Sequence, residues 1–345
     1  MKSDNRKRAN LKDVAVAART SVATVSRVLN DSGYYSDDIR ARVQKAAEKL
    51  NYQPNLNAKS LRQRRSHTIG LLIPNLLNAY YTALADDVSQ LLNTNGYQLL
   101  LSSTRDNPVI EKNTFRQLVG HNVDGLIWVP TAADKKLIDT LINRRIPAVS
   151  IVRKGEGNRL PTIVFEDFAG AKAATSHLLQ LGHTRIGLIG WNIAHSSNYE
   201  RLQGYLKALE GANVPSDEAL IKMGSVNGEH GSSSAEALLQ LPQPPTAIFV
   251  ASNALMPGVM KTLSQHDVNI PDEISLICFD DLEWFQLSKP PISAIAIKHT
   301  HLAEVAVNLL LNRIQNPAEM DKPPLFMQIG FELLLRGSTA PLHRT

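Results

Sequence analysis

The organisation of the N-terminal part of the chain is decided by one stretch, LKDVAVAARTSVATVSRVLN, at residues 11–30. Apolar side chains recur at helical spacing in its first half and again in its second half, so the stretch predicts two short helices. Ser21 stands at the start of the second helix, where its hydroxyl can accept an unpaired backbone N–H. Two helices separated by a turn of about three residues form a helix-turn-helix pattern.

A third helix and a polar connector follow this pattern. Residues 37–50 carry the apolar stripe of an amphipathic helix, and Pro54 ends the unit because it disfavours helical backbone in the residue before it. The next residues are basic and mostly polar. We therefore expect a helix-turn-helix head at residues 1–54, a hinge helix or linker at 55–67 and a core at 68–345.

The core has a different sequence pattern, in which apolar runs of strand length alternate with amphipathic helical stretches. This alternation predicts parallel sheets with right-handed helical crossovers, which is an α/β fold. There are more strands than one open sheet needs, and the pattern restarts after Pro161. We expect two doubly wound lobes that divide near residue 161, with a ligand cleft at the carboxyl ends of the strands.

Charge is distributed unevenly along the chain. Residues 1–66 hold 15 Lys or Arg against 6 Asp or Glu, a net charge of +9, while the remainder carries −4. A small basic head on a mildly acidic body is typical of a polyanion-binding module joined to a regulatory or ligand-binding domain.

Three features favour a cytoplasmic protein without a membrane partner. No apolar run is long enough to predict a transmembrane helix. The N-terminal segment MKSDNRKRANLKD lacks the apolar region of a secretory signal. The single cysteine, Cys278, cannot form an internal disulfide, which fits a reducing compartment.

Several ordered motifs resemble the lactose-repressor (LacI/GalR) family of transcriptional regulators. Besides residues 11–30 they include VDGLIWVP, EDFAGAKAATSHLLQLGHTRIGLIG, VNIPDEISLICFDD and LLLRGST, and the resemblance covers residues 10–338. It implies a core that resembles a periplasmic sugar-binding protein. It also implies a homodimer that binds a pseudo-palindromic operator in double-stranded DNA and a small-molecule effector, a sugar or sugar acid.

For the head, the resemblance implies DNA contacts from the second helix. It puts base readout at Val22 and Ala23, which could pack on a thymine methyl, while Arg27 could donate to guanine. Contacts to phosphates are expected from Ser21, Thr24 and Asn30. In the hinge, Leu61 takes the position of a wedge that kinks the operator, unless it packs only on its own helix. Lys59 and Arg62 would lie beside the phosphate backbone.

The turn of the helix-turn-helix departs from the family. Arg19-Thr20 stands where the family usually has Gly-Val. If the turn needs a positive φ, a residue other than glycine costs roughly 1 kcal/mol there. A contact of the added charge with a phosphate could offset that cost.

For the cleft, the resemblance implies a set of polar contacts. Arg201 matches an arginine whose guanidinium donates a pair of hydrogen bonds to ligand oxygens, and Asp280 matches its acidic partner. Ser252 and Asn253 replace the more usual Asn-Asp. Further residues expected to line the cleft are Asn75, Asn78, Tyr80 and Tyr81. Glu166 and Asp167 are as compatible with helix capping as with ligand contact.

The stretch Ile295–Thr300 departs from the usual family pattern, and it bears on the type of ligand. Lys298 and His299 fall close to positions that line the pocket, and with Arg201 they predict a cationic cleft that prefers a sugar acid to a neutral sugar. Trp128 and Trp284 could stack on a sugar face. The sequence His299-Thr300-His301 has no acidic or cysteine partner at a suitable spacing, so we expect no metal and no cofactor.

Other classes of protein are less compatible with these residues. The main rival is an enzyme that acts on a sugar in an α/β cleft, but neither a GxxxxGK(S/T) phosphate loop nor a GxSxG nucleophile elbow is present. A solute-binding protein would not need the basic head. No leucine heptads follow the core, so we expect a dimer. We therefore predict a non-enzymatic repressor of carbohydrate or sugar-acid catabolism genes that an inducer releases; a purine-like corepressor is the alternative.

Overall fold

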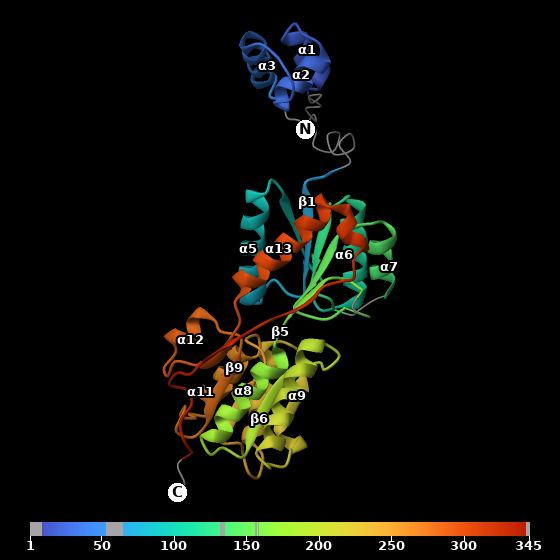
Figure 1. The fold of residues 1–345 in the computed structure, drawn as a ribbon. Coiled ribbons are helices and arrows are strands. Elements are labelled where there is room, and N and C mark those ends of the chain that lie inside the picture. Colours follow the sequence, from blue (N-terminus) through green and yellow to red (C-terminus); the bar gives the residue numbers. More distant parts are fainter. Residues whose placement is uncertain (1–8, 53–64, 132–134, 156, 158, 343–345) are drawn as a thin grey trace. The chain divides into compact units, whose positions relative to one another are not determined.

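The protein, a computed structural model, is described at residues 9–52, 65–131, 135–155, 157 and 159–342. The chain divides into two compact units, Met1–Ser66 and His67–Thr345, both drawn in Figure 1. The first unit contains the head and the second unit is the core. No helix among the described residues is long and apolar enough to cross a membrane.

Three short helices build the head: α1 (Leu11–Ala17), α2 (Val22–Leu29) and α3 (Asp37–Lys49). Each begins at a polar residue that accepts backbone N–H groups of the first turn, namely Asn10, Ser21 and Ser36. The apolar faces of the helices meet in a small core of Val14, Ala15, Ala18, Val25, Val28, Val43 and Ala46. The predicted helix-turn-helix is confirmed.

The turn between α1 and α2 holds Arg19 in the left-handed region, with φ at 51°. An L-residue with a Cβ is disfavoured there, whereas glycine is not. The side chain is exposed and therefore gains little from packing. The turn does require the positive φ that its sequence suggested.

The core contains two six-stranded sheets. The first has the order β11-β5-β4-β3-β1-β2, and all its neighbouring strands are parallel. Its strands are β1 (Thr68–Ile73), β2 (Gln98–Ser103), β3 (Gly125–Trp128), β4 (Ala148–Ile151), β5 (Thr162–Phe165) and β11 (Phe326–Ile329). Helices on both faces bury this sheet, as parallel sheets require. Their apolar residues form two separate clusters, with α5 (Ala79–Thr94) and α13 (His299–Gln315) on one face and α6 (Pro108–Gly120) and α7 (Lys135–Asn143) on the other.

The second sheet has the order β12-β10-β9-β8-β6-β7, in which β12 alone runs antiparallel to its neighbour. Its strands are β6 (Ile186–Trp191), β7 (Ile221–Gly224), β8 (Ala247–Val250), β9 (Ser275–Phe279), β10 (Ser293–Ala296) and β12 (Glu332–Leu334). One face is covered by α8 (Asp167–Gln180) and α9 (Ser196–Gly211). The other is covered by α10 (Gly228–Leu239), α11 (Met256–Gln265) and α12 (Glu283–Leu287).

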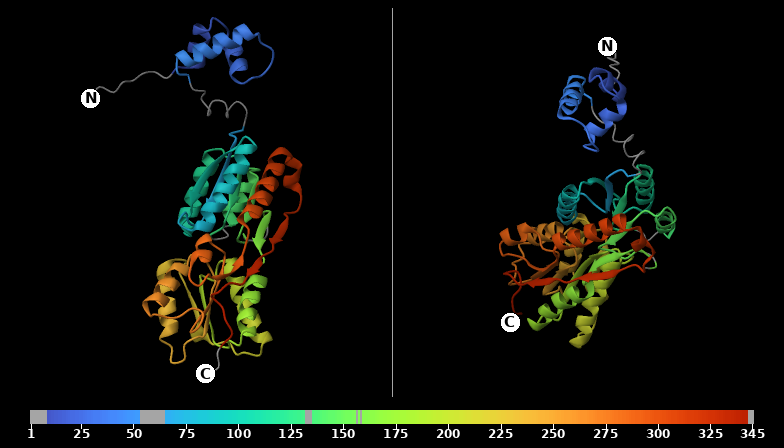
Figure 2. Two further views of the ribbon diagram at one scale, coloured as in Figure 1. Left: turned by 90° about the vertical axis from the view of Figure 1, so that its left-hand side faces the viewer. Right: turned by 45° about the horizontal axis from the view of Figure 1, so that its top comes forward.

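The chain passes between the lobes three times, after β5, after β10 and after β11. Figure 2 shows the late helix α13, in red, packed with the elements of the first lobe. The predicted two-lobed α/β core is confirmed, but the predicted division near residue 161 is wrong. Residues 162–165 pair in parallel with β4 and complete the first sheet, because their apolar side chains are buried there. The second lobe therefore begins with α8.

We expect Arg19→Gly to raise the free energy of unfolding of the head by about 1 kcal/mol, because glycine adopts a positive φ without the steric cost. Urea unfolding followed by far-ultraviolet circular dichroism measures the change. Arg19→Ala is the matched control, since it removes the charge and keeps the Cβ. A glycine variant no more stable than the alanine variant would contradict the assigned cost.

Candidate functional sites

The exposed face of α2 carries the side chains predicted to contact DNA. Val22 is 41% exposed, and Ser21, Ala23, Arg27 and Asn30 are exposed as well. Thr24 is partly buried. Val25 and Val28 point the other way into the core of the head. One face of this helix is therefore fixed by packing, and the other is available to a partner.

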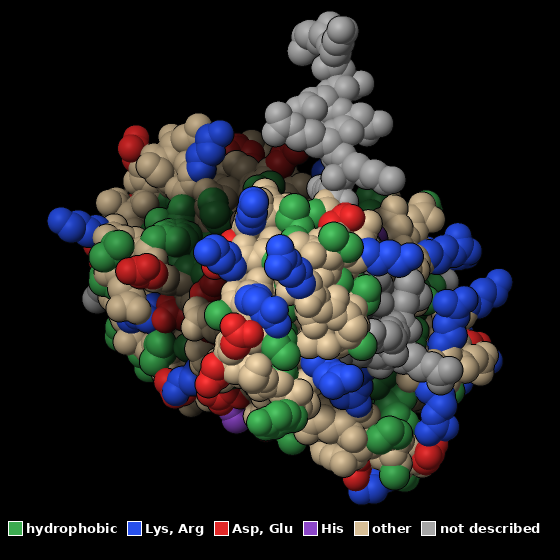
Figure 3. Space-filling view, turned by 90° about the horizontal axis from the view of Figure 1, so that it is seen from above, with side chains coloured by type: hydrophobic (Ala, Val, Ile, Leu, Met, Phe, Trp, Pro, Cys, Tyr) green, Lys and Arg blue, Asp and Glu red, His purple; other side chains and the backbone are tan. Residues whose placement is uncertain are grey.

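Three of the polar residues also stabilise the ends of α2. The Ser21 hydroxyl accepts the backbone N–H of Thr24 at 3.1 Å, and the two hydroxyls lie 2.8 Å apart. At the other end, Asn30 donates from its side chain to the backbone carbonyl of Ser26 at 2.7 Å. These bonds hold the helix that presents Val22 and Arg27. Figure 3, seen from above, shows many Lys and Arg side chains on the surface that faces the viewer.

Three further residues predicted to contact DNA, Lys59, Leu61 and Arg62, lie outside the described residues. Their roles in the hinge remain predictions.

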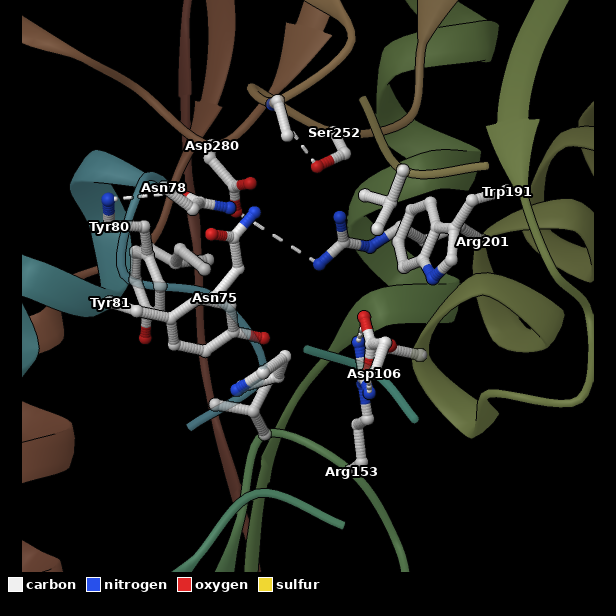
Figure 4. A pocket seen from close by; sticks show the side chains of 16 residues that line it. Asn75, Asn78, Tyr80, Tyr81, Asp106, Arg153, Trp191, Arg201, Ser252 and Asp280 are labelled. Atoms are coloured by element: carbon white, nitrogen blue, oxygen red, sulfur yellow. Dashed lines mark hydrogen bonds and ion pairs between the residues drawn. The ribbon is translucent and has the colours of Figure 1, made fainter. Parts of the chain in front are cut away.

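A pocket in the core is lined by residues from both lobes. Its first-lobe side includes Asn75, Asn78, Tyr80 and Tyr81, which follow β1 and begin α5, and its second-lobe side includes Arg201 and Ser252. Asp280 follows β9 and also lines it. Figure 4 shows Tyr80 and Tyr81 on one side of the pocket and Arg201 on the other. The carboxyl ends of parallel strands thus meet at a polar cavity, as such sheets predict.

Arg201 lies on α9 and is buried, with a 4% exposed side chain. Its Nε donates to Asp167 at 2.8 Å, and one terminal nitrogen donates to the Ala251 carbonyl at 2.6 Å. The guanidinium lies 3.5 Å from the centroid of the Phe279 ring, a cation–π contact. Its other terminal nitrogen is 4.0 Å from an Asp280 oxygen, which leaves that edge of the fork turned toward the cavity.

Asp280 is held in an unusual backbone conformation, with φ at 72°. Its carboxylate accepts from the side-chain nitrogen of Asn253 at 2.8 Å, and burial raises its pKa. Val152, at the end of β4, also has a positive φ of 65° and lines the same cavity. Such strain, costing about 1–3 kcal/mol per residue, gathers at ligand sites more than elsewhere.

Two residues predicted to line the cleft do not. Asn253 is buried behind Asp280, to which it donates. His299 begins α13 and pairs through Nδ1 with Asp87 at 2.5 Å, while its neighbour Lys298 forms an ion pair with Glu332 at 2.7 Å. Neither His299 nor Lys298 is among the residues that line the pocket, so the predicted cationic cleft is wrong. Within the described residues no cluster of side chains is suited to a metal ion.

The expected stacking tryptophans also lie elsewhere. Trp128 is fully buried and donates to Glu111 at 2.8 Å, while Trp284 packs edge-on against Phe285. A different tryptophan, Trp191 at the end of β6, lines the cavity. Asp167, left open between capping and ligand contact, holds Arg201 instead.

Sequence reasoning missed a second arginine–aspartate pair in the cleft. Arg153 follows β4 and Asp106 follows β2, and both line the pocket. Two nitrogens of Arg153 bind the two carboxylate oxygens of Asp106 at 2.5 and 3.2 Å. His195 approaches this pair from the second lobe, with Nε2 at 4.0 Å from Asp106. Their positions just after strands are the signal that could have found Arg153, Asp106 and Trp191.

Carboxylates outnumber arginines in and directly behind the cleft. The two arginines, Arg153 and Arg201, face three acids, Asp106, Asp167 and Asp280. Burial, together with the nearby Arg153 and against the opposing effect of Asp106, lowers the pKa of His195 to about 4, so this imidazole is neutral near neutral pH. The site therefore has no net positive charge to offer an anion.

Comparisons with known proteins agree with this architecture. Residues 10–55 match the family described as bacterial regulatory proteins, lacI family, and residues 175–339 match a periplasmic binding protein-like domain. The HTH-type transcriptional repressor PurR of Actinobacillus pleuropneumoniae serotype 3 (strain JL03) is 30% identical over 336 residues, which cover 97% of this chain and 100% of that protein.

Two solved structures extend the similarity. A lac repressor dimer bound to operator and the anti-inducer ONPF has a TM-score of 0.85 at 25% identity, covering 97% of this chain and 100% of that one. A complex of the transcriptional regulator CelR with cellobiose has a TM-score of 0.72 at 25% identity, covering 96% of this chain and 100% of that one. The chain belongs to the LacI family of DNA-binding transcriptional regulators.

The pKa of Asp167 tests whether burial or the attraction of Arg201 has the larger effect on this carboxyl group. Burial raises this pKa from 3.8 to about 6, against the opposing effect of Arg201. As the pH rises between these values, the unfolded chain releases the proton before the folded protein does. The carboxyl group therefore makes its most favourable contribution to stability at low pH, and that contribution is lost as the pH rises through about 6.

We expect the free energy of unfolding of the native protein to fall relative to that of Asp167→Asn as the pH rises through about 6. Chemical denaturation at a series of pH values measures the difference. Because the variant also removes the charge opposite Arg201, the change of this difference with pH is compared, and not its absolute size. A native protein that gained stability relative to the variant over this range would show that the attraction of Arg201 outweighs desolvation.

Proposed function

We propose that this protein is a repressor that binds a pseudo-palindromic operator as a homodimer and leaves it when a neutral sugar or nucleoside fills the cleft. One chain joins an exposed helix-turn-helix face to a polar pocket between two lobes, and this combination carries the proposal. The relatives are repressors rather than enzymes, so we infer a non-enzymatic role. Because its target is DNA, we assign it to the cytoplasm.

The head reads DNA through α2 in the major groove. Val22 and Ala23 contact base edges at the start of the helix, and Arg27 donates to a guanine one turn later. Ser21, Thr24 and Asn30 contact phosphates, which fix the register without specifying sequence. The exposure of Val22 supports this assignment, since an apolar side chain in water gains by packing on a thymine methyl.

Residues 55–67 form the hinge between the two units. Leu61 wedges into the centre of the operator, and Lys59 and Arg62 flank the phosphate backbone. A segment with so little apolar surface is not stable as an isolated helix, so it folds on DNA. The lac repressor dimer bound to operator supports a dimer on DNA, and a dimer would bring two such segments to one operator.

The effector is neutral because the cleft is not cationic. Arg201 and Asp280 offer one donor edge and one acceptor edge, a combination that suits a hydroxylated ring. The cellobiose bound to CelR supports a sugar, and a nucleoside-like ligand is the alternative within the proposal. We assign the effector as an inducer, which weakens operator binding. If saturating effector tightened operator binding, the effector would be a corepressor instead.

Selection of bound sequences from random DNA duplexes tests the proposal. We expect recovery of an inverted repeat, because a two-fold dimer reads two half-sites. We expect Arg27→Ala to cost about 1–3 kcal/mol of binding and to relax the preference at one base of each half-site.

Arg42→Ala is the matched control for Arg27→Ala, since it removes the same charge from α3, where Arg42 is 45% exposed and pairs with Asp38. Equal losses in both variants would remove Arg27 from base readout. Recovery of no enriched sequence would overturn the proposed function.

A further inference from the structure

The turn between α1 and α2 places Arg19 at a position where glycine is preferred. The N–H of Thr20 donates to the Ala15 carbonyl at 3.0 Å. The N–H of Arg19 donates to the Val16 carbonyl at 3.2 Å. These two bonds form the Schellman motif that closes many helices, in which the residue after the cap has a positive φ. The way in which α1 ends therefore dictates the φ of 51° at Arg19, a backbone conformation that is unfavourable for a residue with a Cβ.

Other helices of the protein mostly end with residues that tolerate a positive φ. Glycine has no Cβ, and Asn and Asp are found in this conformation more often than other residues. A second arginine, Arg145 after α7, has the same φ of 51°, and it forms an ion pair with Asp321 at 3.2 Å. At the other helix ends, the residue after the cap is Asp31, Asn51, Gly96, Asn122, Gly182, Asn213 or Asp267.

The head supplies no comparable partner for Arg19. Its side chain is exposed. The ion pairs of the head join Arg40 to Asp31 and Arg42 to Asp38, so within the described residues the charge of Arg19 is unpaired. Backbone strain that no contact within the protein offsets is concentrated at functional sites. The position of Arg19 therefore points to a contact with another molecule.

Arg19 also lines an open groove on the head. The groove contains a second exposed cation, Lys12, and no acidic side chain is among the described residues that line it. Ser21 and Val22, which the proposed function places on a phosphate and on a base edge, line the same groove. Two cations without an opposing acid thus lie beside the part of α2 that contacts DNA. The complete lining is Lys12, Ala15, Val16, Arg19, Thr20, Ser21 and Val22.

We propose that Arg19, together with Lys12, binds a phosphate of the DNA backbone at each half-site. The inference rests on the proposed function and adds a contact that the proposed function does not include. A guanidinium donates paired hydrogen bonds to phosphate oxygens, and the release of counterions from DNA makes such a contact favourable. This gain offsets the cost of a residue other than glycine in the turn. Because every nucleotide step carries a phosphate, the contact adds affinity without sequence preference.

Arg19→Gly tests this inference, because it removes the charge and relieves the backbone strain together. The head of the variant should be more stable than the native head, so weaker DNA binding cannot result from a loss of folding. Binding of the full chain to the selected operator is measured by fluorescence anisotropy at a series of salt concentrations. We expect the slope of log K against log salt to fall by about 0.9 for each head, and the affinity to fall at least roughly tenfold at about 0.1 M salt.

Two further variants separate the charge from the backbone conformation. Arg19→Lys keeps a positive charge and a Cβ, and it should retain most of the salt dependence. Arg145→Gly is the matched control, since it removes an arginine with the same φ from the core, and it should bind DNA like the native protein. Selection from random duplexes with Arg19→Gly should return the native inverted repeat, because a phosphate contact weakens binding uniformly across sequences.

Three results would overturn the inference. They are a native salt slope in Arg19→Gly, a slope in Arg19→Lys as low as in Arg19→Gly, and an equal fall of the slope in Arg145→Gly. Any of them, together with operator selection by the native protein, rejects this inference and leaves the proposed function standing. A native protein that selects no DNA sequence rejects the proposed function instead. The slopes on a random duplex then decide whether Arg19 contacts phosphates, since such contacts form on any duplex.

Discussion

The buried cation of Arg201 is the constraint on which the rest of the cleft depends. A guanidinium removed from water must be compensated, and here Asp167, the Ala251 carbonyl and the Phe279 ring supply the compensation. These partners come from α8 and from the ends of β8 and β9. The Arg201 guanidinium therefore holds three elements of the second lobe together. Its remaining terminal nitrogen is directed toward Asp280 and the cavity.

The chain crosses between the lobes three times, so ligand binding in this site is linked to how the two lobes are arranged. Residues from both lobes line the pocket. Outside the pocket the lobes are also in direct contact, as in the ion pair between Lys154 and Glu200 at 2.8 Å. A ligand that bonds to both lobes favours the arrangement in which those bonds form, and it can shift only an equilibrium for which it has different affinities. In the proposed function, a change between the lobes would reach DNA through residues 55–67, which join the head to this core in the sequence.

Local patterns made most of the fold predictable, and contacts distant in sequence limited the rest. Helical spacing and caps predicted the head, and strand–helix alternation predicted the sheets. The resemblance placed Arg201 at the pocket. It did not single out Arg153, whose position just after β4 carries the signal but whose pairing with Asp106, 47 positions away at the end of another strand, is visible only in the fold. Lys298 and His299 were misplaced because α13 returns to the first lobe, where His299 meets Asp87.

The linkage between the two sites is the most direct test of the account. The affinity for the selected operator should be measured with and without the neutral compound that stabilises the protein most, and the affinity for that compound with and without operator. The account predicts that each ligand weakens the binding of the other by the same factor, about 5–150-fold for a typical coupling. An effector affinity that is unchanged by bound operator would contradict it.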